Sequence, residues 1–469
     1  MKANSVQTLI DSLAGAVTID GETVTVKNEP LLREKVDGVV YTAVFATGLI
    51  RDTARWLLWQ LGQTLGIYPS SIHELYMAVG RGESPHPFTV PAMNVRAMNF
   101  NTSRAIFRAA KKYDAGAFIF EIARSEMGYT DQRPAEYVSS LIGAAIKEGF
   151  RGPLFVQGDH IQVSAKNYTA DPDKEVGAVK DLIKEAIAGG FYNIDIDTST
   201  LVDLDFDTLD EQQYTNYSLC ARLTEYVRSL EPDGITVSLG GEIGEVGGHN
   251  STVPELHAFM QGYNREVGSA TGISKISVQT GTSHGGVVLP DGTLADVNVD
   301  FETLQELSRV AREEYGLGGA VQHGASTLPP SAFGKFPEVG TVEIHLATNF
   351  QNITYDNLPE NIVDTAYNYV LSNLKNEWKE GKTEDQFIYS TRKKAIGPFK
   401  QQWWDLSAAV QEKVGRVLQD EFEFLFDKLA IANTRDFANE VTSVVKVRKP
   451  RPTEAAEETD LEIASDLAD

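Results

Sequence analysis

The stretch "GPLFVQGD" (152–159), followed by "DKEVGAVKDLIKEAIAGG" (173–190) and "FYNIDID" (191–197), decides the fold class. The first and third segments are short and mostly apolar, which is typical of buried strands. The middle segment repeats its apolar residues with helical spacing and ends in two glycines. A strand, a helix and a second strand in this order predict a parallel βαβ unit.

The same kind of strand recurs along the chain between residues 88 and 347. Six further apolar segments have this character: "FTVPAMNV" (88–95), "AGAFIFEI" (115–122), "ITVSLGGE" (235–242), "ISKISVQTG" (273–281), "GGAVQHG" (318–324) and "TVEIHLA" (341–347). Segments of helical spacing separate them, so eight strands in alternation favour a closed (β/α)8 barrel. A doubly wound open sheet is the alternative, but it normally has fewer strands. The sequence contains no GxGxxG or P-loop pattern that would indicate nucleotide binding.

Composition shifts divide the chain into four parts. We expect a mostly helical N-terminal extension at residues 1–84, which includes a hairpin at 17–26, and the barrel at residues 85–380. A C-terminal helical segment is predicted for residues 381–449. Residues 450–469 form an acidic tail without aromatic residues, which predicts disorder.

Charge and cysteine content narrow the classes of partner. The net charge of −24 argues against nucleic acid, because a phosphate backbone needs a basic surface. The single cysteine, Cys220, excludes an internal disulfide and suits a reducing compartment. No apolar run predicts a membrane span or a secretory leader. We therefore expect a soluble, cytoplasmic protein.

Ionisable residues gather where the predicted strands end. They are Asp159 and His160 after the third strand, Asp195 and Asp197 in the fourth, Glu242 after the fifth, His284 beyond the sixth, His323 at the end of the seventh and His345 in the eighth. Four of the eight histidines of the chain therefore lie at this one face. Chemistry in such barrels takes place at the carboxyl ends of the strands. Three histidines and a carboxylate predict a site for Zn²⁺ or a similar divalent ion. The alternative for each histidine alone is a buried, hydrogen-bonded core residue.

Two of these histidines lie in glycine-rich loops, "GTSHGG" (281–286) and "QHGAST" (322–327). Small residues let backbone N–H groups approach an anion closely, as in the phosphate sites formed by the late loops of such barrels. Glycine-rich loops are also ordinary tight turns. The pairing of each loop with a candidate metal ligand favours the phosphate site.

The motifs together resemble a known family. "GDH" (158–160), "EIGEVGG" (242–248), "GTSHGG" (281–286) and "HGAST" (323–327) are similar to the corresponding loops of the metal-dependent class II fructose-bisphosphate aldolases. The resemblance spans residues 88 to 400. It implies a zinc-dependent aldolase that acts on a phosphorylated ketose, with fructose 1,6-bisphosphate as the default substrate.

The resemblance also implies individual roles. His160, His284 and His323 would bind the zinc, Glu242 would join its coordination, and Asp197 matches an acidic residue near an accessory metal site. Asp159 would be the acid/base for the C4 hydroxyl group. The implied phosphate- and substrate-binding residues are Gly285, Gly324, Ser326, His345, Thr348 and Arg392. Carbonyl groups of the glycine-rich loops would hold a monovalent cation. Arg392 or Lys393 would match an arginine that a neighbouring subunit contributes in the family. The resemblance also implies a homodimer or homotetramer.

The sequence departs from the family at the eighth strand. The family has an Asn-x-Asp pair there, whereas this chain has His345 and Ala347 and retains Thr348. The mobile loop after "EIGEVGG" lacks the family's glutamate at the matching place, and His249 and Glu255 are candidate substitutes. Two alternatives to the aldolase therefore stay open. One is a lyase or isomerase of the same barrel that acts on a different sugar phosphate, and the other is a non-catalytic aldolase-type subunit.

Overall fold

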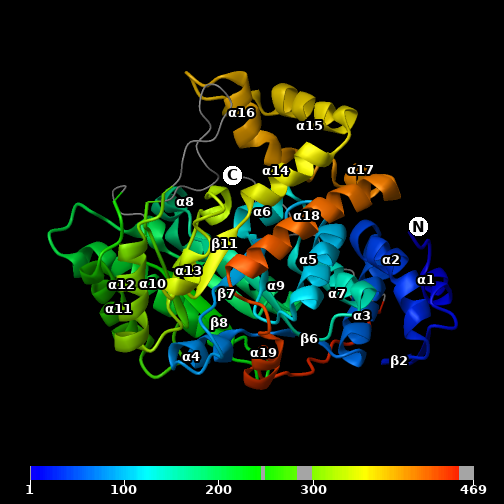
Figure 1. Ribbon diagram of the computed structural model, residues 1–469, viewed down its shortest axis with the longest axis horizontal. Coiled ribbons are helices and arrows are strands. Elements are labelled where there is room, and N and C mark those ends of the chain that lie inside the picture. Colours follow the sequence, from blue (N-terminus) through cyan, green and yellow to red (C-terminus); the bar gives the residue numbers. More distant parts are fainter. Residues whose placement is uncertain (1, 245–248, 282–297, 454–469) are drawn as a thin grey trace.

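The computed structural model describes residues 2–244, 249–281 and 298–453, and its centre is a closed barrel of eight parallel strands (Figure 1). The strands are β4 (Val90–Asn94), β5 (Ile119–Ala123), β6 (Gly152–Gln162), β7 (Asn193–Asp197), β8 (Ser238–Glu242), β9 (Lys275–Val278), β10 (Ala320–Gln322) and β11 (Glu343–Leu346). Each strand pairs with the next, and β11 pairs with β4 to close the barrel. The predicted (β/α)8 barrel is therefore confirmed.

Helices surround the strands. They include α5 (Asn99–Tyr113), α6 (Arg124–Tyr129), α7 (Pro134–Glu148), α8 (Ala165–Ala170), α9 (Pro172–Gly189), α10 (Leu209–Arg228), α11 (Val253–Val267), α12 (Phe301–Tyr315), α13 (Lys335–Glu338) and α14 (Thr348–Asn357). Helix α9 shows how the sequence sets their ends. The side chain of Asp171 accepts a hydrogen bond from the backbone of Lys174, Pro172 occupies the first turn, and Gly190 ends the helix with a φ of 108°.

The N-terminal segment packs against one side of the barrel. It contains α1 (Val6–Ser12), β1 (Val17–Asp20), β2 (Thr23–Val26), α2 (Glu29–Phe45), α3 (Gly48–Thr64), β3 (Ile67–Ser70) and α4 (His73–Gly80). Strands β1 and β2 form the predicted hairpin. Helix α2 lies against α7 so closely that a Cβ atom on Gly143 would be 2.1 Å from Cγ2 of Val40. Glycine is required here because two helices meet without space for a side chain.

Strand β6 is unusual because its two halves have different partners on one side. The first half, from Gly152 to Phe155, pairs with β3, which the sequence did not predict as a strand. The second half pairs with β7, with an irregularity between Gly158 and Ile161. His160 lies within this bulge and has a φ of 38°. A bulge with a left-handed residue redirects a side chain, and here it turns the end of β6 at the barrel mouth.

The C-terminal part forms two groups of helices that lie on the barrel. Helices α15 (Glu360–Asn373) and α16 (Glu384–Thr391) extend from α14 above the rest of the molecule, and α17 (Lys400–Trp404) leads back from them (Figure 1). Helix α18 (Ala408–Lys428) packs on α5, and α19 (Arg435–Val441) follows. The segment after α19 runs along α3, where the indole N–H groups of Trp56 and Trp59 donate to the carbonyls of Lys449 and Val447. The tail from residue 450 was predicted to be disordered. Its residues from 454 on lie outside the described ones.

Among the described residues, no helix combines the length and apolar character that a membrane crossing needs.

The tight contact between α2 and α7 gives a stability prediction. We expect Gly143→Ala to lower the free energy of unfolding, because the new methyl group overlaps Val40 and overpacking costs about 1–3 kcal/mol. Gly177→Ala in α9 is the matched control, because nothing lies within 4 Å of its Cβ position. It should stabilise the protein by up to about 1 kcal/mol through helix propensity alone. Thermal unfolding midpoints measure both effects, and an increase for Gly143→Ala similar to that for Gly177→Ala would contradict the packing.

Candidate active site at the barrel mouth

A cavity of about 870 Å³ opens at the carboxyl ends of the barrel strands. Its floor contains Asp159, His160, His323 and His345, which come from the ends of β6 and β10 and from β11. Its outer wall includes residues of the segment from 377 to 393, which belongs to the helices above the barrel. The cavity therefore joins the barrel mouth to the C-terminal helices, as expected for a ligand site of this fold.

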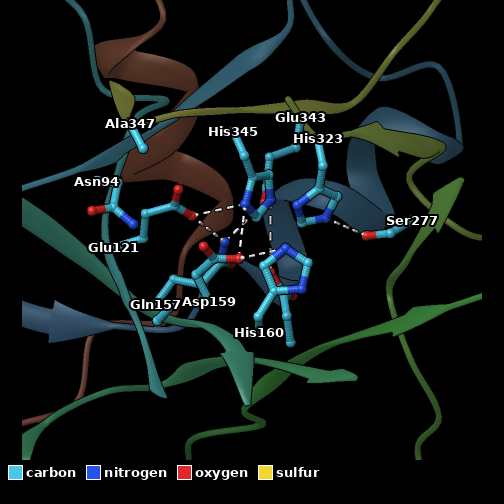
Figure 2. Close-up of polar contacts among 12 residues, drawn as sticks. Asn94, Glu121, Gln157, Asp159, His160, Ser277, His323, Glu343, His345 and Ala347 are labelled. Carbon is cyan, nitrogen blue, oxygen red and sulfur yellow. Dashed lines mark hydrogen bonds and ion pairs between the residues drawn. The ribbon is translucent and has the colours of Figure 1, made fainter. Parts of the chain in front are cut away.

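Three imidazole rings converge on this floor (Figure 2). The ring centroids of His323 and His345 are 4.0 Å apart, and those of His160 and His323 are 4.3 Å apart. At least one nitrogen of each ring lies beside a polar side chain. Nδ1 of His160 is 3.1 Å from Oδ2 of Asp197, Nε2 of His323 is 2.9 Å from Oγ of Ser277, and Nε2 of His345 is 2.6 Å from Oε1 of Glu343. Such partners orient metal-binding histidines in proteins.

Asp159 lies between two of the rings. Its Oδ1 is 3.1 Å from Nδ1 of His345 and 3.7 Å from Nε2 of His160. The carboxylate is buried, with 6% of the residue exposed. Asp159, His160 and His323 each offer one ligand atom, and the three atoms lie within 4.8 Å of one another. Imidazole nitrogens with a carboxylate oxygen are the donors that Zn²⁺ and similar ions prefer.

Two more carboxylates adjoin His160 on its other side. Oε2 of Glu242 is 3.4 Å from Nδ1 of His160, and the three residues His160, Asp197 and Glu242 form another candidate group of ligands. Burial and repulsion by Asp197 raise the pKa of Glu242 to about 7. Burial alone would raise the pKa of Asp197, but hydrogen bonds with His160 and Ser199 lower it overall. Both carboxylates therefore lie beside the imidazole of His160 at the barrel mouth.

The other predicted loop residues differ in whether the structure describes them. His284 and Gly285 lie outside the described residues. Gly324 and Ser326 line the cavity with Thr348, and Gly324 has a φ of 69° that favours glycine. Oγ of Ser326 accepts a hydrogen bond from the backbone N–H of Ala347, so it connects the β10 loop to the end of β11.

Arg392 does not line the described cavity of its own chain. Its guanidinium is buried over the ring of Tyr355, donates to the hydroxyl of Tyr367 and donates to Oδ1 of Asn352. The next residue, Lys393, lines the cavity. Arg96 and Arg124 also line it, and Arg96 pairs with Glu126. The described cations of the cavity wall thus include Lys393 and exclude Arg392.

A buried network beneath the histidines was missed by sequence reasoning. Nζ of Lys275 lies 2.5 Å from Oε1 of Glu343, 2.9 Å from Oδ1 of Asp195 and 2.7 Å from Oε1 of Gln157. Burial opposes the charge of Lys275, but Asp195 and Glu343 raise its pKa overall. The pKa of Glu343 is lowered to about 2, because Lys275 and His345 outweigh its burial. Single charged residues inside apolar strands such as "KISV" and "EIHL" were the available signal.

The family model for class-II fructose-bisphosphate aldolase matches residues 84–411. The chain belongs to this family. The match includes the whole barrel and the helices over its mouth, and it leaves the N-terminal segment outside. Membership supports an aldolase-type lyase. A comparison with curated protein sequences finds no match.

Several solved structures are similar to the chain at low identity. A probable tagatose 6 phosphate kinase from Sinorhizobium meliloti 1021 has a TM-score of 0.50 and 15% identity over 76% of this chain and 95% of that one. Fructose-bisphosphate aldolase from Campylobacter jejuni has a TM-score of 0.45 and 18% identity over 80% of this chain and 95% of that one. An aldolase from Escherichia coli K12 has a TM-score of 0.40 and 14% identity over 72% of this chain and 98% of that one. At these identities the similarity concerns the fold alone.

The buried lysine gives a second stability prediction. We expect Lys275→Met to lower the free energy of unfolding by about 3–5 kcal/mol, because it leaves buried carboxylates without their partner. The double change Lys275→Met with Glu343→Gln should cost less than the sum of the two single changes. Urea unfolding of the metal-free protein measures these values.

Arg309→Met is the control for this prediction, because it removes an exposed ion pair with Glu313 and should change stability little. A Lys275→Met protein as stable as this control would show that Lys275 does not hold the network together.

Proposed function

We propose that the protein is a zinc-dependent aldolase that cleaves or forms a phosphorylated ketose, with fructose 1,6-bisphosphate as the default substrate. The observation that carries this proposal is the group of Asp159, His160 and His323 at the mouth of the barrel, in a chain of the class II aldolase family. In the cleavage direction the products would be dihydroxyacetone phosphate and glyceraldehyde 3-phosphate.

The donor set supports a divalent ion at this group. His160 and His323 would hold it, with His284 as the third histidine that the sequence supplies and Glu242 close by. Asp197 and Ser277 fix the orientation of the two described rings. A bound Zn²⁺ supplies Lewis-acid stabilisation of the negative charge that develops on the three-carbon fragment.

Asp159 is the residue that we assign to proton transfer. In cleavage the bond between C3 and C4 breaks, and its electron pair remains on the three-carbon fragment as an enediolate. The C4 oxygen becomes the aldehyde oxygen while its proton passes to the Asp159 carboxylate. In synthesis the proton returns along the same path. The contact with His345 holds the carboxylate at the floor of the cavity.

The walls of the cavity suit an anionic substrate. Gly324 and Ser326 present small residues beside the candidate metal ligands, and Arg96, Arg124 and Lys393 add positive charge to the outer wall. These groups favour a sugar phosphate in a chain whose net charge is −24. The resemblance further predicts a monovalent cation held by loop carbonyls and a cytoplasmic homodimer or homotetramer.

The residues in β11 and directly after it favour a second candidate function. His345 and Ala347 occupy the places of the family's Asn-x-Asp pair, and His345 is engaged by Glu343 and Asp159. These differences lie where the family binds the ketone end of its substrate. They favour a lyase or isomerase that acts on a different or singly phosphorylated sugar. Assays against a panel of ketose mono- and bisphosphates separate the two candidates. A protein inactive on the whole panel would support the non-catalytic subunit instead.

Metal removal tests the proposal directly. We expect a chelator to abolish cleavage, and added Zn²⁺ to restore it, because the negative charge of the enediolate needs a cation. His323→Ala should lose zinc from this group and turnover together. Metal analysis and a coupled assay measure both. Cleavage at full rate by metal-free protein, or a lysine adduct that borohydride traps, would contradict the mechanism.

A second test separates proton transfer from binding. Asp159→Asn keeps the size of the side chain and the histidines, so substrate affinity should change little. The value of kcat should fall by roughly 10² to 10⁴, the usual contribution of a positioned acid/base. Asp173→Asn, at an exposed residue of α9, is the matched control. If both variants turn over at the wild-type rate, Asp159 has no part in catalysis.

A further inference from the structure

We infer that Glu121, Asp159 and His345 form a second divalent-cation site beside the histidine group. Nδ1 of His345 is 3.0 Å from Oε2 of Glu121 and 3.1 Å from Oδ1 of Asp159. One ligand atom from each of the three residues lies within 4.8 Å of the other two, and all three residues are buried. The resemblance that suggested the first site assigns no metal to Glu121 or His345.

The orientation of His345 supports this site. Its Nε2 is 2.6 Å from Oε1 of Glu343, so the ring presents Nδ1 to Glu121 and Asp159 (Figure 2). Glu343 is itself held by Lys275 and by the hydroxyl of Tyr76. A ligating histidine commonly donates its second ring nitrogen to a carboxylate that is held in this way. The arrangement around His345 therefore matches that around His160 and Asp197.

The state of Glu121 is the second, independent observation. The residue is fully buried, and its Oε1 accepts no hydrogen bond from any residue that the structure describes. Its Oε2 accepts one from Gln157 at 3.2 Å. A buried carboxylate with an unsatisfied oxygen needs a proton or a cation. The unsatisfied oxygen belongs to the carboxylate whose Oε2 contacts His345, so a cation held by this group would offset the buried charge.

The network around His345 contains more carboxylates than lysine or arginine side chains. Four buried carboxylates surround His345: Glu121, Asp159, Asp195 and Glu343. Lys275 pairs with two members of this set, Asp195 and Glu343. A divalent ion held by a neutral His345 would offset two of the remaining charges.

The two sites would be neighbours. Asp159 belongs to both groups of ligands, and the rings of His323 and His345 are 4.0 Å apart. Its carboxylate would then connect two ions in the manner of two-metal centres, whose ions lie about 3.5–4 Å apart. One imidazole and two carboxylates suit Mn²⁺ or Zn²⁺. The inference shares Asp159 with the proposed function, and its test measures metal content alone.

Metal stoichiometry tests the second site. The full chain is stripped of metal, saturated with Zn²⁺, desalted and analysed for bound metal. We expect about two ions per wild-type chain and about one for Glu121→Gln and for His345→Gln, because each change removes one ligand from a three-ligand site. Glu136→Gln is the matched control, because it removes another buried glutamate whose partners are Lys400 and Arg55. It should retain two ions.

The wild-type protein alone provides a second measurement that does not depend on how the variants fold. Loaded with Mn²⁺, it should give the electron paramagnetic resonance spectrum of two exchange-coupled ions. A six-line spectrum of isolated Mn²⁺, one ion per wild-type chain, or two ions in both site variants would overturn the inference, since protons would then neutralise the carboxylates. A protein that binds two coupled ions and cleaves no ketose phosphate would refute the proposed function alone.

Discussion

The ion pairs of Lys275 with Glu343 and Asp195 are the constraint on which the rest of the site depends. Two carboxylates and an ammonium group lie in the interior of a closed barrel, where each would be strongly unfavourable alone. Glu343, fixed by the lysine, in turn holds Nε2 of His345. The orientation of His345 then sets the place of Asp159 at the barrel mouth. The positions of His345 and Asp159 at the barrel mouth therefore depend on the ion pairs of Lys275 in the centre of the barrel.

Strand β6 makes the second contribution, because it links the N-terminal segment to the site. Its first half is paired by β3 and its second half by β7, and the bulge that ends in His160 lies within the second half. Pairing on both sides fixes the strand before the bulge, so the left-handed conformation of His160 is held by its surroundings. The N-terminal segment thus supports the strand that supplies Asp159 and His160.

The wall of the cavity includes cationic side chains although the chain as a whole is acidic. The net charge is −24, yet Lys393 from the segment that follows α16 and Arg96 from the barrel face the same cavity. Burial and the nearby Arg96 lower the pKa of Lys393, because both disfavour its charged form.

The sequence alone determined the eight strands of the barrel and the presence of Asp159, His160, His323 and His345 at one face. Both follow from local rules, because strand periodicity and the common direction of parallel strands are properties of short segments. Only the tertiary structure decided that β3 pairs with β6, that Lys393 and not Arg392 lines the cavity, and that Glu121 meets His345. Closing the barrel brings the interior residues of β5, β9 and β11 together across its centre. Such contacts depend on register and closure, and these are set by the packing of the whole chain.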